Sequence, residues 1–193
     1  ERASPPLAIR IPSRGAQWRA LTHHDVGAVV QLLHESEAAD KSAYRTTHAE
    51  IEELFAAQHS AYGGFDPIFG LVAYGYVRVE VEDEQVEAIC SGAVHPRWRG
   101  RKLGTGIIEW QIDTARHMLS ESGHEGEARI VHIADQSISG IDEILTESGF
   151  TARESSTLLR RDLAEPILDV ELARTLAVRS EEHTSELQSL SRI

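Results

Sequence analysis

The most informative segment of the chain runs from Val94 to Gly106 and reads Val-His-Pro-Arg-Trp-Arg-Gly-Arg-Lys-Leu-Gly-Thr-Gly. Before it, residues 86–94 are short, apolar and followed by a proline, which predicts a β-strand. After it, Leu103 to Leu119 contains no proline and repeats apolar residues at helical spacing, which predicts an amphipathic helix. The stretch is therefore predicted to be a loop that joins a strand to a helix.

This loop is cationic although the chain is acidic. Arg97, Arg99, Arg101 and Lys102 stand close together in a protein whose net charge is -12. Their charges repel one another, and the dipole of the following helix adds about half a positive unit at its N-terminus. A bound anion would relieve this repulsion, and the first-turn amides of a helix are natural phosphate donors. We therefore expect the loop to cradle a diphosphate.

The glycines of the loop separate it from two common phosphate-binding motifs. Gly100, Gly104 and Gly106 have no Cβ, so the backbone can approach a phosphate closely. A P-loop would need Gly-Lys followed by Ser or Thr, but Gly104 is followed by Thr105 and another glycine. The dinucleotide fingerprint is also absent, because Glu109 stands where the third glycine would be.

The pattern Arg101-x-x-Gly104-x-Gly106, behind a strand that ends Val94-x-Pro96, resembles the acetyl-CoA loop of the GCN5-related N-acetyltransferases, the GNAT superfamily. The strand, Val-x-Pro, Arg-Gly and helix occur in the family order. The resemblance implies an α/β (α+β) fold, the GNAT fold, with a mixed central β-sheet, a strand–helix–strand acetyl-CoA unit and helices on both faces. The alternative is a basic surface turn that caps an ordinary helix.

Elements predicted elsewhere in the chain follow the same family order. Thr47 and Glu50 form a full capping box, and Thr22 with Asp25 forms a variant of it. The glycine-rich residues 62–67 predict a turn. The other expected elements are strands at 17–21, at 68–82 (a single strand or a bent pair), at 128–134 and at 156–162, and a short helix that Ser139 and Asp142 cap and Gly149 ends.

The resemblance covers about residues 17–162, which we expect to be a GNAT acetyltransferase domain. Residues 1–16 are expected to be a flexible lead-in and residues 163–178 a linker. Residues 179–193 are expected to be a non-native tail, because Arg179 to Ser189 resembles a translated sequencing adapter. A natural polar tail is the alternative. The favoured interpretation is a fragment of a longer gene product.

Composition limits the class of protein. The chain has 193 residues, 41% hydrophobic and 26% charged, as expected for one globular domain. The acidic balance argues against a nucleic-acid partner, and no apolar run is long enough to span a membrane. Cys90 is the single cysteine, which suits a reducing cytoplasm. The ten histidines lack metal-ligand spacing, so no metal site is expected.

Carried over by position, the resemblance implies that the pantetheine arm meets the strand backbone and that the loop binds the diphosphate. A strand amide near Val94 is expected to polarise the acyl carbonyl. Lys102 replaces a glycine that many relatives have. The implied cofactor-binding residues are Gly92, Ala93, Val94, Arg99, Gly100, Arg101, Lys102, Leu103, Gly104, Thr105 and Gly106.

The catalytic groups of the family are harder to place. Its bases often lie four to six residues before the valine, where this chain has Cys90 and Ala88. Glu87 is one residue out of phase and is the candidate base; the alternative is a solvated strand charge. The tyrosine that protonates the leaving thiolate corresponds to Leu145. The resemblance therefore supports cofactor binding more strongly than catalysis.

Two functions follow from the resemblance. The first is an enzyme that transfers an acetyl group from acetyl-CoA to the amine of a small molecule or peptide. The second is a catalytically weak, acetyl-CoA-binding half of a tandem GNAT protein, similar to mycothiol synthase, whose second domain is missing. The sequence does not identify the acceptor, and it predicts neither a nucleic-acid nor a membrane partner.

Overall fold

The computed structural model describes residues 15–57, 59–82, 85–124, 126–156 and 164. The chain divides into two units, Glu1–Leu158 and Leu159–Ile193. All elements below belong to the first unit. Most of the expected lead-in, linker and last strand, and the whole of the expected tail, lie outside the described residues.

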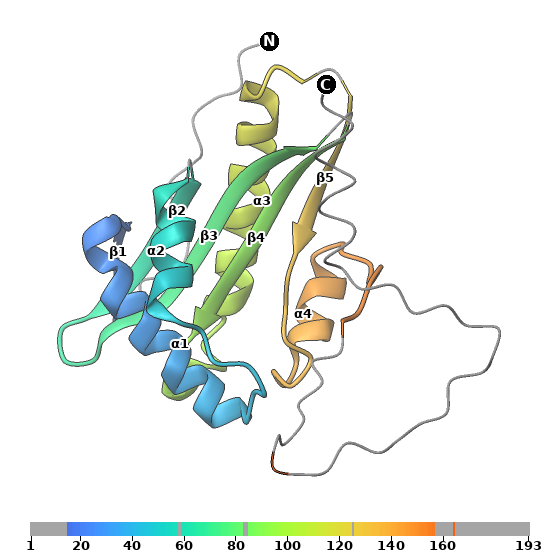
Figure 1. Cartoon of the computed structure of the whole chain (residues 1–193). Coiled ribbons are helices and arrows are strands. Elements are labelled where there is room, and N and C mark those ends of the chain that lie inside the picture. The colour runs from blue at the N-terminus through green and yellow to red at the C-terminus, as the bar shows by residue number, and fades with distance from the viewer. Residues whose placement is uncertain (1–14, 58, 83–84, 125, 157–163, 165–193) are drawn as a thin grey trace, which may run out of the picture. The chain divides into compact units, whose positions relative to one another are not determined.

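The described strands form one mixed sheet in the order β1-β2-β3-β4-β5 (Figure 1). Neighbours from β1 to β4 are antiparallel, and β4 and β5 are parallel. The predicted strand–helix–strand unit is therefore present as β4, α3 and β5. The strands are β1 (Gln17–Ala20), β2 (His59–Asp66), β3 (Gly70–Glu82), β4 (Gln85–Val94) and β5 (Glu127–His132).

Helices cover both faces of the sheet. α1 and α2 lie on one face and α3 lies on the other (Figure 1). This arrangement confirms the predicted α+β class. The helices are α1 (Val26–Asp40), α2 (His48–Ala56), α3 (Leu103–Glu121) and α4 (Ile141–Glu147), and short 3₁₀ turns cover His23–Asp25 and Pro96–Trp98.

Both predicted capping boxes are present. The Thr47 N–H donates to the Glu50 carboxylate at 2.6 Å, and the Glu50 N–H donates to the Thr47 hydroxyl at 3.3 Å. The Thr22 N–H donates to Asp25 at 2.9 Å, and a 3₁₀ turn leads from there into α1. These bonds satisfy donors that a helix N-terminus leaves unpaired.

The predicted alternation along β4 is also confirmed. Ala88 and Cys90 belong to the buried cluster that contains Ala115 of α3. Ala93 packs on the opposite cluster, which contains Tyr74 and the apolar residues of α1 and α2. Residues of even number therefore face α3, and residues of odd number face α1 and α2.

The turn predicted at residues 62–67 is wrong, because most of these residues lie inside β2. A Cβ on Gly63 would lie 2.6 Å from Leu21, and a Cβ on Gly64 would lie 2.9 Å from Trp18. These glycines serve close packing within the sheet, which a local turn rule does not detect.

The predicted cap of the last helix needs a similar correction. Gly140, at φ +77°, is the N-cap of α4, not Ser139, because glycine readily adopts this left-handed conformation. Gly149, at φ +90°, follows the helix as predicted. Residues 150–156 form no strand, and the rest of the strand predicted at residues 156–162 lies outside the described residues.

Candidate functional site

The parallel strands β4 and β5 separate before β4 ends. Their pairing stops at Cys90 and His132, and the Ile133 N–H donates to the Cys90 carbonyl at 3.1 Å. β4 continues to Val94, paired there with β3 alone among the described strands. We call the opening between Ser91–Val94 and the chain after His132 the fork.

Backbone groups of β4 point into the fork. The His95 N–H donates to the Val72 carbonyl at 2.8 Å, so the odd-numbered residues direct their backbone groups toward β3. Successive residues of a strand alternate in this direction. The amides of Gly92 and Val94 therefore face the fork, whereas those of Ala93 face β3.

A buried glutamine binds β4 and β3 together at the start of the fork. Gln111 of α3 has no exposed surface, and its Nε2 donates to the Ser91 carbonyl at 2.6 Å and to the Tyr76 carbonyl at 3.3 Å. A Cβ on Gly92 would lie 2.5 Å from the Tyr74 carbonyl oxygen. Only glycine fits at this position, so β4 can lie close to β3 beside the fork.

The N-terminus of α3 opens at the end of β4. Lys102 is its N-cap, in the left-handed region at φ 60°, and Gly100 has φ +74°. The first intrahelical bond runs from the Gly106 N–H to the Lys102 carbonyl at 3.2 Å. The N–H groups of residues 103–105 are therefore free for another acceptor, as in the first turn of any helix.

Gly104 shows that this first turn has room for a ligand. Its φ is not left-handed, and an added Cβ would meet only Val94, at 4.0 Å. Neither backbone geometry nor packing within the protein requires a glycine here. The missing Cβ keeps the approach to the helix N-terminus open beside the fork, which fits the diphosphate of a coenzyme.

The four loop cations have different surroundings. Arg97, Arg101 and Lys102 are exposed, and the Arg101 guanidinium lies 4.3 Å from the centre of the Trp98 ring. The guanidinium of Arg99 binds both oxygens of a carboxylate, that of Asp40, at 2.5 and 2.6 Å. Three of the cations can therefore meet an anion in solvent, while Arg99 already has an internal partner.

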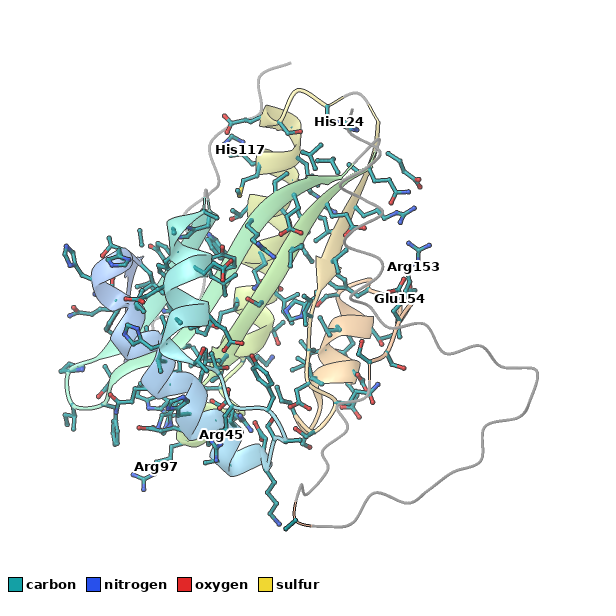
Figure 2. The ribbon with its side chains drawn as sticks, in the orientation of Figure 1. Arg45, Arg97, His117, His124, Arg153 and Glu154 are labelled. Carbon is teal, nitrogen blue, oxygen red and sulfur yellow. The ribbon has the colours of Figure 1, made fainter. Side chains whose placement is uncertain are left out.

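Side chains far from the loop do not belong to this site. Figure 2 shows Arg45 and Arg97 at one end of the domain and His117 and His124 at the other. Among the described residues, no group of three or more His, Cys, Asp and Glu side chains could hold a metal ion.

The structure does not bring Glu87 to the open end of the fork. Glu87 is in register with Arg129, whose Nη1 lies 3.9 Å from its carboxylate. It precedes Gly92 by five positions, or roughly 16 Å along a strand. The sequence position of this carboxylate on β4 therefore separates it from the groups that would surround an acyl carbonyl.

Two other reactive side chains meet at the point where β4 and β5 separate. Burial raises the pKa of the Cys90 thiol to about 12, so it stays protonated and is a poor nucleophile. Burial lowers the pKa of His132 to about 4, so its ring is neutral at pH 7. Both side chains face α3, and the His132 ring meets the edge of Phe150 at 6.0 Å.

Two carboxylates of α1, Glu37 and Asp40, were not predicted from the sequence as parts of the site. They continue the buried stripe of Val30 and Leu33 at helical spacing. Their side chains are only 11% and 10% exposed. The signal was present in the sequence, because carboxylates on the apolar stripe of a helix need buried partners.

Comparison with known proteins identifies the fold. No family model and no curated protein matches the sequence. The GCN5-related N-acetyltransferase from Sphaerobacter thermophilus is 22% identical, with a TM-score of 0.60, over 72% of this chain. A predicted acetyltransferase with acetyl-CoA from Clostridium acetobutylicum is 11% identical, with a TM-score of 0.57, over 75% of this chain and 96% of its own.

A third similar structure is an aminoglycoside acetyltransferase from an uncultured soil metagenomic sample, in complex with sisomicin. It is 16% identical, with a TM-score of 0.51, over 77% of this chain and 97% of its own. The chain spans 44% of the length of the Sphaerobacter protein. At these identities the matches establish the fold, which is that of the GCN5-related N-acetyltransferases.

Proposed function

Starting from this fold, we propose that the protein binds acetyl-CoA and transfers its acetyl group to the amine of a small molecule or peptide. One observation carries the proposal: the amides of Gly92 and Val94, which face the fork, lie beside the free N-terminus of α3. Gly104, which neither the backbone nor the packing requires, leaves room between them. Such a surface can hold an extended chain that ends in a diphosphate.

Each part of the site has a task in this proposal. The free first-turn amides bind the diphosphate, and the exposed Arg101 and Lys102 neutralise it. The backbone of Gly92 and Val94 holds the pantetheine arm, and the Val94 N–H is a donor for the acyl oxygen. Acetyl-CoA supplies the thioester. The transfer forms an amide C–N bond and breaks the C–S bond; the amine loses a proton and the leaving thiolate gains one.

The proposed acceptor class is supported by one of the similar structures. The aminoglycoside acetyltransferase is in complex with sisomicin, so the fold accommodates a small molecule of that kind. A net charge of -12 also favours a cationic acceptor over an anionic one. Within the described residues, no helix is both long enough and apolar enough to cross a membrane.

A second candidate function is an acetyl-CoA-binding half of a longer, tandem protein. Two observations favour it: the match to the Sphaerobacter protein covers 44% of that chain, and Glu87 lies away from the open end of the fork. On this hypothesis residues 17–162 form one GNAT domain of the pair. A cytoplasmic location, suggested by the single buried thiol of Cys90, suits both candidates.

Two measurements separate these functions: calorimetry with acetyl-CoA, and release of free CoA in the presence of a panel of amines. Binding with amine-dependent CoA release supports the transferase. Binding without turnover supports the tandem-half hypothesis. Failure of the folded protein to bind acetyl-CoA contradicts both.

A further inference from the structure

On the α1 side of the fork, β4 itself supplies no group that could take up a proton from an amine. The residues that face this side near the open end are Ser91 and Ala93. Glu87 faces the same side but is bound by Arg129 farther back along the strand. A base for this part of the site must therefore come from another element.

The helix that covers this face, α1, carries a carboxylate on the side that packs against the sheet. Glu37 follows Val30 and Leu33 at helical spacing, on the stripe by which α1 packs against β3 and β4. Its side chain is 11% exposed. A carboxylate on this stripe points toward the sheet, whereas most charges of a surface helix point to solvent.

One oxygen of the Glu37 carboxylate is occupied and the other is free of hydrogen bonds. Oε1 accepts from the Thr46 N–H at 3.0 Å and from the Thr46 hydroxyl at 2.5 Å. Oε2 is buried and accepts no hydrogen bond from the described residues. Its nearest cation is Arg45, whose Nη1 lies 3.6 Å away on a side chain that is 58% exposed.

Tyr74 connects this carboxylate to the fork. It lies on β3 opposite Ala93, and its hydroxyl interacts with the side chain of Ser91. Burial raises the pKa of Tyr74, and the nearby negative charge of Glu37 raises it further. The phenol therefore remains protonated. It bonds Ser91, the residue next to Gly92, and lies close enough to Glu37 to sense its charge, without a direct hydrogen bond between the two side chains.

The other carboxylates on this half of α1 have partners already. Asp40 is held on both oxygens by Arg99. Glu35 is 2.6 Å from the His95 imidazole. The charged or titratable groups that interact with Glu37 are Arg45 and Tyr44, from the connection to α2, and Tyr74, from β3. Glu37 is thus the carboxylate of this helix face that keeps an oxygen available.

We propose that Glu37 is the general base of the reaction and takes up the proton of the acceptor amine through the Tyr74 hydroxyl. The amine transfers its proton to the Tyr74 oxygen while the phenolic proton passes to a water molecule between Tyr74 and Glu37, and a proton of that water passes to Glu37, which becomes a neutral carboxylic acid. The amine lone pair then forms the bond to the acyl carbon. Since these protons move together, no buried tyrosinate is formed. This assignment rests on the proposed transferase function.

The test compares the variants Glu37→Gln and Tyr74→Phe with the parent protein. The carbonyl oxygen of a glutamine can still accept both bonds from Thr46, so the connection between α1 and α2 is preserved. Removal of a general base lowers rates by about 10²- to 10⁴-fold. We expect a fall in kcat of at least about 100-fold in each variant, with an unchanged Kd for acetyl-CoA by calorimetry.

The chain offers a matched control pair. Tyr44 donates to the carboxylate of Glu50 on the same side of the domain, but both side chains are exposed and neither faces the sheet. Tyr44→Phe and Glu50→Gln should therefore retain the parent kcat. A general base acts only when deprotonated, so the kcat of the parent should decline at low pH, and Glu37→Gln should abolish this decline. Thr46→Val removes a hydrogen bond from Glu37 but keeps the carboxylate, so it should preserve the decline.

Four outcomes would contradict the inference. Retention of the parent kcat and pH profile by folded Glu37→Gln or Tyr74→Phe refutes the base while leaving the transferase intact. Loss of the low-pH decline in Thr46→Val as well assigns Glu37 a structural role. Acetyl-CoA binding by the parent without turnover of any amine refutes both, and failure to bind acetyl-CoA refutes the proposed function at its first step.

Discussion

The Arg99 guanidinium binds the Asp40 carboxylate through two hydrogen bonds of 2.5 and 2.6 Å. Its Nε also donates to the Val94 carbonyl at 3.2 Å. Asp40 ends α1 and Val94 ends β4, so this one side chain fixes the fork edge of the sheet to the helix above it. The contact changes what is expected of Arg99, which sequence reasoning placed among the diphosphate ligands.

We expect Arg99 to act by positioning Val94. Asp40→Asn should destabilise the fold by about 2 kcal/mol, because it leaves a partly buried guanidinium without its charged partner. Adding Arg99→Met to this variant should cost less than the two single effects together. Urea denaturation of the two single variants and the double variant measures this coupling.

Acetyl-CoA affinity tests the same assignment from the ligand side. A cation that binds the diphosphate contributes less at high ionic strength, because salt screens exposed charges. Arg101→Met should weaken the dependence of Kd on salt, whereas the Arg99→Met, Asp40→Asn double variant should preserve it. A reversed result would place Arg99 on the diphosphate.

Gly104→Ala should weaken acetyl-CoA binding without loss of stability. The new methyl group meets only Val94, at 4.0 Å, and alanine is the better helix former by about 1 kcal/mol. We expect at least a tenfold rise in Kd with an equal or higher melting temperature. Gly27→Ala in α1 is the control, since nothing lies within 4 Å of its Cβ position; it should affect melting temperature alone.

Lys102→Gly should stabilise the fold and reduce cofactor affinity. The left-handed conformation of Lys102, at φ 60°, costs a non-glycine residue about 1 kcal/mol. Lys41, at φ 56° after α1, carries the same strain away from the loop. Thermal denaturation should show a gain of up to about 1 kcal/mol in both glycine variants. Calorimetry should show weaker acetyl-CoA binding in Lys102→Gly alone.

Asp25 should make stability fall in acid. Hydrogen bonds from Arg19 above all lower its pKa to about 2, against a partly opposing effect of burial. A carboxylate whose pKa is lower in the folded state adds stability above its unfolded value, and that stability disappears as the pH falls toward 2. Asp25→Asn should cost about 2 kcal/mol at pH 7 and much less at pH 2. An equal loss at both pH values would contradict this account.

Local rules predicted the features that depend on neighbours in sequence. The loop before α3, the capping box of Thr47 and the alternation along β4 all follow from spacing within a few residues. Gly63 was placed in a turn because its reason for being glycine, the side chain of Leu21, lies far away in the chain.

The site shows the same limit. Backbone positions such as Val94 could be assigned, because strand alternation sets their direction. The roles of Asp40 and Glu37 could not, because they depend on which loop and which strand pack against the C-terminal half of α1. The periodicity of α1 shows that both carboxylates are buried, but not what they contact.

Asp40 and Glu35 both anchor α1 to the segment that precedes α3, through Arg99 and His95. A molecule that shifts this helix on one side of the sheet must therefore also disturb the segment of His95 and Arg99 before α3. If the domain is the proposed transferase, acetyl-CoA and the acceptor amine should consequently change each other's affinity by the same factor, which calorimetry of each ligand in the presence of the other measures.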